Sequence, residues 1–102
     1  MNTMDILPIE IRHKLPKIQA TEEQEDPIVV CKFFFPDFSW TWYAIEFDGD
    51  DLFFGYVAGD YPELGYFTLS ELQNNVGKFG CSIERDVNFE PTKLSDVRKL
   101  HE

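Results

Sequence analysis

Basic residues are missing from the middle of this chain, because residues 33–77 contain no lysine or arginine. Cysteine is also scarce: Cys31 and Cys81 are the only two, too few for a disulfide framework. Both lie beside apolar residues, so we expect reduced thiols in a cytoplasmic protein. No stretch approaches the roughly 20 apolar residues that a membrane span requires. Residues 1–17 mix acids with bases and lack an uninterrupted apolar core, which argues against a signal peptide.

The formal net charge is −10, and residues 33–77, which we call the base-free run, carry most of it. This run holds eight acids, whereas residues 1–32 carry six acids against four bases and residues 78–102 carry five of each. A negative field repels phosphate groups, so we expect no direct binding to nucleic acid or to a membrane surface. The same field attracts a basic protein surface, mainly by raising the association rate.

Aromatic residues are concentrated in the same part of the chain. The base-free run holds fourteen of the sixteen aromatic residues. This content of large apolar groups argues against disorder. At this length it predicts a single acidic domain, residues 1–102, that buries its own core.

β-Branched and aromatic residues mark the strands of a mainly antiparallel sheet of about four strands. We expect strands over residues 28–35, 40–47 and 52–58, which form a meander over 28–58, and a further strand near 83–89. Asp48-Gly49 is typical of the hairpin between the second strand and the third. Alternation in the second strand predicts two faces: Trp40, Trp42, Ala44 and Glu46 on one, and Thr41, Tyr43, Ile45 and Phe47 on the other.

Two or three short helices complete the predicted α+β fold. The spacing of apolar residues predicts a first helix over about residues 5–15. Thr68 and Glu71 have the spacing of a capping box, so a second helix is expected to begin at Thr68. Leu69 and Leu72 of that helix should face the core.

The C-terminal residues predict a last short helix. Leu94, Val97 and Leu100 recur at helical spacing, and His101 is expected to bond the final carbonyls of the helix. Before the second helix, residues 66–67 are expected to add a short strand pairing.

Seven carboxylates and one tyrosine are the candidates for contact with a basic partner. They are Asp37, Glu46, Asp48, Asp50, Asp51, Asp60, Tyr61 and Glu63. Held on strands and tight turns, the carboxylates would stand in for phosphates and occupy a nucleic-acid-binding groove on another protein. The plain alternative is an acidic surface with no specific target.

The loop carboxylates leave a second interpretation open, a small metal-dependent hydrolase. The hairpin acids at residues 48–51 have oxygen ligands for a hard cation, and Asp60 with Glu63 is conceivable as a general acid and base. The spacing matches no EF-hand loop, and no nucleophile or phosphate-cradling glycine pattern accompanies these residues. We therefore assign no catalytic residue, metal ligand or cofactor.

The aromatic residues support a third interpretation, a structural homo-oligomer. Both faces of the strand over residues 40–47 are largely apolar, and the predicted helices are few and short. Some rings should therefore stay exposed and anchor a partner, or pair two copies of the chain as a homodimer.

Four segments resemble a known family when they are taken together. They are LPKIQATEE at 15–23, FFFPDFSWTWYAIEFD at 33–48, LFFGYVAGDYPELGYFTLSEL at 52–72 and IERDVNFEPTKLSDV at 83–97. As a block they resemble a small bacterial domain family of unknown function carried on plasmids, integrative elements and phages, often near conjugation or antirestriction genes. The resemblance implies a mobile-element setting and brings no catalytic residue. It leads us to expect an inhibitor of a host defence protein, such as a CRISPR or restriction system.

Overall fold

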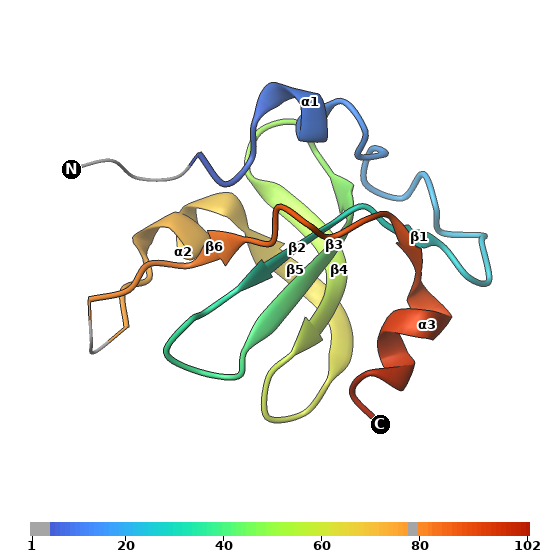
Figure 1. The fold of residues 1–102 in the computed structure, drawn as a ribbon. Coiled ribbons are helices and arrows are strands. Elements are labelled where there is room, and N and C mark those ends of the chain that lie inside the picture. The colour runs from blue at the N-terminus through green and yellow to red at the C-terminus, as the bar shows by residue number, and fades with distance from the viewer. Residues whose placement is uncertain (1–4, 78–79) are drawn as a thin grey trace.

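The computed structural model describes residues 5–77 and 80–102 (Figure 1). The helices are α1 (Ile9–Arg12), α2 (Leu69–Asn74) and α3 (Leu94–Lys99). The strands are β1 (Ile28–Val29), β2 (Cys31–Phe34), β3 (Thr41–Phe47), β4 (Leu52–Ala58), β5 (Glu63–Thr68), β6 (Glu84–Arg85) and β7 (Thr92–Lys93). One antiparallel sheet has the order β5-β4-β3-β2-β6, and β1 pairs with β7 in a second sheet. The α+β class and the antiparallel meander are confirmed, with five strands in the main sheet where about four were predicted.

The hairpin between β3 and β4 forms where Asp48-Gly49 predicted it. Gly49 has a φ of 91°, a left-handed conformation that glycine adopts without a steric penalty. The Oδ1 atom of Asp48 accepts hydrogen bonds from the N–H groups of Asp50, Asp51 and Leu52 at 2.8, 2.9 and 3.0 Å. These bonds, that from Asp50 first, stabilise the charged carboxylate and lower the pKa of Asp48.

A β-bulge in β3 changes which residues share a face. Ala44 and Glu46 lie opposite consecutive residues of β4, so Ile45 is an extra residue between them. Beyond the bulge the alternation reverses: Phe47 joins the same buried cluster as Ala44, and Glu46 lines a hollow beside α3. The predicted faces of this strand are therefore right up to Ala44 and wrong for Glu46 and Phe47.

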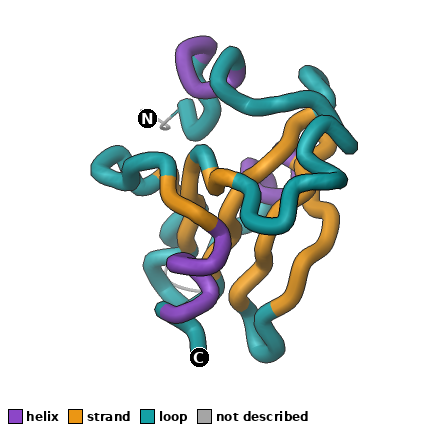
Figure 2. Tube along the Cα trace, turned by 90° about the vertical axis from the view of Figure 1, so that its right-hand side faces the viewer, coloured by secondary structure: helices purple, strands orange, loops and turns teal. Residues whose placement is uncertain are grey.

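Two buried clusters lie on opposite faces of the main sheet, and Figure 2 views the sheet from the side of α3, with α2 behind the strands. On one face, which we call the α2 face, α2 and the N-terminal segment cover the sheet. The cluster there includes Leu7, Leu15, Phe33, Phe47, Phe53, Leu69 and Leu72. On the α3 face, the cluster includes Val29, Tyr43, Ile45, Tyr56, Leu94 and Val97.

The start of α2 agrees with the prediction, and the ends of α1 do not. The Oγ1 atom of Thr68 accepts a hydrogen bond from the N–H of Glu71 at 3.1 Å, which confirms Thr68 as the N-cap, and both leucines of α2 are buried. The helix α1 has only four residues, although a helix over about 5–15 was predicted. The carboxylate of Asp5 accepts a bond from the N–H of Leu7 at 3.2 Å, so it closes a turn before Pro8 and caps no helix.

Two aspartates from distant loops hold the first turns of α2 and α3. Asp51 accepts hydrogen bonds from the N–H and the hydroxyl of Ser70, both at 2.8 Å. Asp26 does the same for Ser95, at 2.8 and 2.7 Å, and these bonds lower the pKa of Asp26, with the hydroxyl bond as the largest cause. The partners are 19 and 69 residues apart, a separation that no local sequence pattern reveals.

Three predicted strands have different lengths in the structure. The strand over 28–35 is interrupted at Val30, and β1 turns away to pair with β7, which was not predicted. The strand near 83–89 is reduced to β6, because the N–H of Phe89 donates to the carbonyl of Asp86 and closes a turn. In contrast, β5 pairs with β4 over its whole length, beyond the short pairing expected at 66–67.

His101 anchors the C-terminal turn to the sheet. Its Nε2 atom lies 2.7 Å from the hydroxyl of the buried Tyr43, and the two rings meet edge to face with centroids 5.4 Å apart. The prediction that its side chain bonds the last helix carbonyls is therefore wrong. Burial first, and then the positive charge of Lys32, lower the pKa of His101 below its usual 6.5.

This lowered pKa predicts a loss of stability in mild acid. Near pH 6 the unfolded chain binds a proton at His101 more readily than the folded protein does. The stabilisation is full above pH 6.5 and is lost as the pH falls through that value toward the lowered pKa. His101→Gln should flatten the pH dependence of the free energy of unfolding between about pH 5 and 7, measured by urea denaturation. His13→Gln, at an exposed position, is the control and should leave the slope intact; an unchanged slope in His101→Gln would contradict this account.

A candidate protein-binding surface

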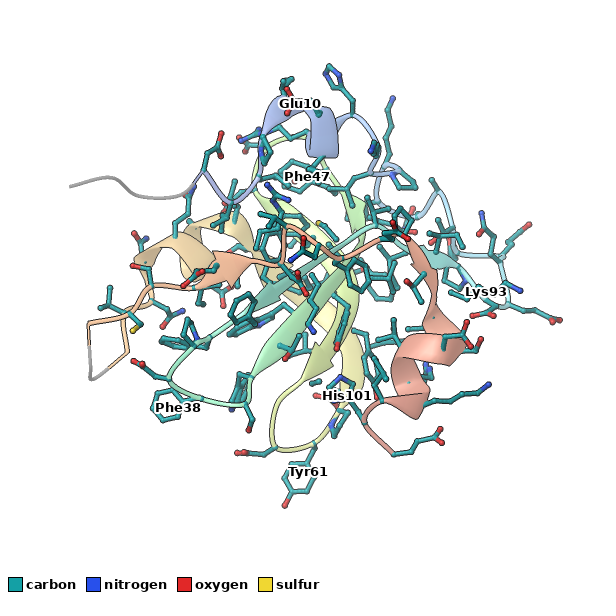
Figure 3. All side chains as sticks on the ribbon, in the orientation of Figure 1. Glu10, Phe38, Phe47, Tyr61, Lys93 and His101 are labelled. Carbon is teal, nitrogen blue, oxygen red and sulfur yellow. The ribbon has the colours of Figure 1, made fainter. Side chains whose placement is uncertain are left out.

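The predicted partner-binding acids lie at two opposite ends of the sheet. Residues 48–51 form the β3–β4 hairpin, whereas Asp37 lies in the β2–β3 turn and Asp60 in the β4–β5 turn. In an antiparallel meander, consecutive turns lie at alternate ends. Figure 3 shows this separation through Phe47, next to the hairpin, and Tyr61, which lie toward opposite ends of the sheet. The acids therefore do not form one continuous array.

At the hairpin end, two of the three carboxylates already have partners within the chain. Asp48 accepts three backbone hydrogen bonds of the turn, and Asp51 caps α2 through Ser70. The third, Asp50, is exposed. The carboxylates of Asp48 and Asp51 therefore stabilise the fold at this end of the sheet, and the exposed Asp50 is the one of the three with no assigned role in the turn.

Glu46 is buried, and it cannot belong to an exposed acidic edge as predicted. Its side chain lies beneath the segment before β1, with 3% of the residue exposed. Oε1 accepts a hydrogen bond from the N–H of Gln19 at 2.8 Å, and Oε2 accepts from the N–H of Thr21 at 2.9 Å and from the Thr21 hydroxyl. The physical reason for the error is the bulge at Ile45, which turns Glu46 to the α3 face.

At the opposite end, three of the predicted residues are fully available to a partner. Asp60 and Tyr61 lie in the β4–β5 turn, and Tyr61 is 86% exposed. Glu63 is also exposed, and it is the first residue of β5 where a loop was expected. These three residues are close in sequence and lie at the same end of β5.

Asp37 is half-buried, and its carboxylate contacts the segment around Gly77 and Cys81. Its carboxylate lies so close to Gly77 that a Cβ there would be 1.8 Å from Oδ2. A hydrogen bond with Asp37 is the largest cause that raises the pKa of the Cys81 thiol. Asp37 therefore ties the β2–β3 turn to the segment around Gly77 and Cys81.

Two aromatic hollows meet at Trp40 on the α2 face. The first, of about 400 Å³, is lined by Phe35, Phe38, Trp40, Trp42, Glu71 and Asn75. The second, of about 330 Å³, is lined by Trp40, Val57, Gly59, Asp60, Tyr61, Glu63, Gly65 and Tyr66. The indole of Trp40 lies directly over Gly59, where an added Cβ would be 2.6 Å from Cη2. Because residue 59 is a glycine, the indole of Trp40, which separates the two hollows, can pack directly against the β4–β5 turn.

We call the exposed part of these hollows the acidic aromatic surface. It consists of Phe38, Trp40, Asp60, Tyr61, Glu63 and Glu71. Its rings are unusually open for their size, with Phe38 52%, Trp40 39% and Tyr61 86% exposed. Both hollows are lined by carboxylates and rings, and among the described residues no lysine or arginine lines either of them. Aromatic faces and carboxylates both attract cations, so this arrangement suits lysine and arginine side chains.

In the described part of the chain, the residues considered for metal binding do not form a cluster. Among residues 5–77 and 80–102, no three His, Cys, Asp or Glu side chains are arranged to hold a metal ion. Both cysteines are free, and burial raises the pKa of Cys31 to about 12, so its thiol is protonated and unreactive at neutral pH. Within the same residues, no helix is long and apolar enough to cross a membrane.

The sequence pattern selected Asp60, Tyr61 and Glu63 of this surface, whereas Phe38, Trp40 and Glu71 had no assigned role in partner binding. The position of Trp40 directly before β3, beside a turn, is a weak signal of exposure. The sequence does not distinguish exposure of Trp40 from burial, because this depends on how much of the α2 face of the sheet is covered by α2.

These features define an acidic α+β domain with an exposed aromatic surface at one end of its sheet. The chain belongs to the protein family of unknown function DUF2958, whose family model matches residues 6–99. The expected membership in a family of unknown function is confirmed, and the match begins earlier than residue 15, where the resemblance was first placed. No curated protein and no solved structure matches the chain.

Proposed function

We propose that this protein is a non-enzymatic binding module that engages a basic surface of a nucleic-acid-handling protein. The observation that carries the proposal is the acidic aromatic surface, where exposed rings and carboxylates lie together with no base among the residues that the structure describes. Aromatic side chains that lose water on binding contribute most of the binding free energy at many interfaces. Carboxylates add selectivity for a cationic partner. Occlusion of that basic surface would block its access to nucleic acid.

The proposal is narrower than a mimic of a whole phosphate array. Glu46 is buried, Asp48 and Asp51 are bonded within the chain, and Asp37 is half-buried. Asp50 is exposed but lies at the opposite end of the sheet, and Glu71 accepts a hydrogen bond from the hydroxyl of Thr68. Mimicry of phosphates therefore rests on Asp60 and Glu63, and the rings contribute the rest. We further propose that the target is a host defence protein, such as a restriction or CRISPR nuclease, in keeping with the mobile-element setting that the resemblance implies.

Charge reversal on this surface tests the proposal. Asp60→Lys combined with Glu63→Lys should weaken capture of the partner by about tenfold or more, because a basic partner would then meet repulsion. The measurement is affinity capture from a bacterial lysate with a salt gradient and quantitative mass spectrometry. The supporting result is a basic nucleic-acid-handling protein that is released at moderate salt and lost with this variant.

The matched control changes the net charge equally at a different place. Glu23→Lys with Glu90→Lys alters two exposed acids outside the acidic aromatic surface and should retain the partner. Equal loss with both variants would mean that only net charge matters. Equal retention with both would mean that the partner does not use this surface.

The same exposed rings favour a second candidate function, a structural homo-oligomer. Phe38, Trp40 and Tyr61 could cover one another between two copies of the chain. Light scattering separates the two, because a monomer at high micromolar concentration argues against self-association. A dimer that Trp40→Ala converts to a monomer would favour it over the basic partner.

A further inference from the structure

The strand β5 is a long edge strand beside the acidic aromatic surface. It ends the main sheet, and within residues 5–77 and 80–102 β4 is its only neighbour in that sheet (Figure 1). It has six residues, whereas β6, the strand at the other edge, has two. Lysine, proline and bulges commonly protect exposed edges, and β5 contains neither lysine nor proline. An edge of this kind is a template for a further strand.

The backbone groups of β5 that are free to pair can be deduced from the register. The N–H of Asp48 donates to the carbonyl of Leu52, so even-numbered residues of β4 bond to β3 and odd-numbered ones face β5. The odd-numbered residues of β5 lie opposite these and bond back to β4. The N–H and C=O groups of Leu64 and Tyr66 therefore point away from the sheet. Among the described residues, no strand pairs with this outer edge.

A hollow on each face of the sheet borders this edge. On the α3 face, a hollow of about 340 Å³ is lined by Phe54, Leu64, Tyr66, Leu94, Arg98 and residues of the segment before β1. On the α2 face, Glu63 and Gly65 line the second hollow of the acidic aromatic surface. Because side chains of a strand alternate between faces, an added strand would place its residues in the two hollows in turn.

We propose that the partner binds by adding an extended, basic segment to the outer edge of β5. This inference rests on the proposed function, because it names how that partner would engage. Backbone bonds to Leu64 and Tyr66 would hold the segment, with apolar side chains on the α3 face against Phe54 and Leu64. Lysine or arginine on the other face would meet Asp60 and Glu63. A second copy of the chain is less suited to the edge, since it would bring the same carboxylates.

The probe is a short capped peptide of alternating lysine and valine, titrated into the wild-type protein and followed by NMR. We expect shifts at the amides of Leu64 and Tyr66 and slower hydrogen exchange at both. The same peptide with N-methylated central amides keeps its charge and side chains but loses backbone donors. It should bind about tenfold more weakly, the effect of losing two net hydrogen bonds. No binding, or equal binding of both peptides, would overturn strand addition.

A pair of protein variants tests the edge from the other side. Leu64→Pro removes an N–H that faces outward, a change that an edge strand tolerates. It should lower the affinity for the peptide about fivefold relative to Leu64→Thr, which keeps this N–H. Equal affinity of these two variants would overturn the pairing even if one peptide bound. A dimer that only Leu64→Pro dissociates would overturn the basic occupant in favour of a second copy.

The charge variant separates failure of this inference from failure of the proposed function. If Asp60→Lys with Glu63→Lys loses the captured partner while the N-methylated peptide binds as well as its parent, strand addition is wrong and the basic partner stands. If the parent peptide pairs with β5 and the charge variant keeps the captured partner, the edge site stands and the basic surface is wrong.

Discussion

Replacing Gly55 with alanine is expected to destabilise the protein by about 3 kcal/mol or more, the upper range for overpacking a closely packed site. A Cβ on Gly55 would be 1.9 Å from the carbonyl oxygen of Tyr43 and 3.2 Å from the Cα of Ala44. Both neighbours are backbone atoms of β3, so no side-chain rotation relieves the contact. The close approach lies next to the bulge at Ile45, where the pairing of β3 with β4 shifts by one residue. The strands must separate here, in the centre of the sheet.

Gly65→Ala is the matched control for this change. Gly65 lies directly opposite Gly55 in β5, and an added Cβ there would meet nothing within 4 Å. We expect its effect to be within about 0.5 kcal/mol, or slightly stabilising, because glycine weakens a strand. Urea denaturation at one pH measures both variants. Similar free energies of unfolding for the two would show that the β3–β4 approach at Gly55 can relax.

The meander was predictable because local signals and tertiary packing agree there. β-Branched and aromatic runs, the Asp48-Gly49 turn and the Thr68 N-cap each act within a few residues, and the structure contains all of them. The strand β5 was mostly missed because Glu63 and Gly65 have low strand propensity. Pairing with β4 along its whole length decides its conformation instead.

The candidate site was only partly predictable, because it depends on what covers the sheet. The acids at Asp60 and Glu63 follow from their turn, whereas the exposure of Trp40 follows from the shortness of α2. Glu46 shows the opposite failure. Simple alternation placed it on the same face as Trp42 and Ala44, and one extra residue at Ile45 reverses every side chain beyond it.

Loss of the Glu46 carboxylate should cost about 3 kcal/mol, because two backbone amides and a hydroxyl would lose a charged acceptor in a largely buried site. The carboxylate bonds Gln19 and Thr21, and Gln19 has a φ of 74°, which is unfavourable for a residue with a side chain. Without this bond the backbone around Gln19 can relax to an ordinary conformation. Glu46→Ala should therefore both lower the free energy of unfolding and speed hydrogen exchange at the amides of Gln19 and Thr21.

Thr21→Val is the partial counterpart, since it removes the hydroxyl and keeps both backbone bonds to Glu46. Its cost should be about 1 kcal/mol, the net contribution of one hydrogen bond and the penalty for its unpaired acceptor.

Because Gln19 and Thr21 form a wall of the hollow on the α3 face, Glu46→Ala should also weaken binding of the peptide at β5. Charge-dependent capture by Asp60 and Glu63 should persist below the melting temperature. If Glu46→Ala abolished that capture in the folded protein, the buried carboxylate would have a role beyond holding this segment.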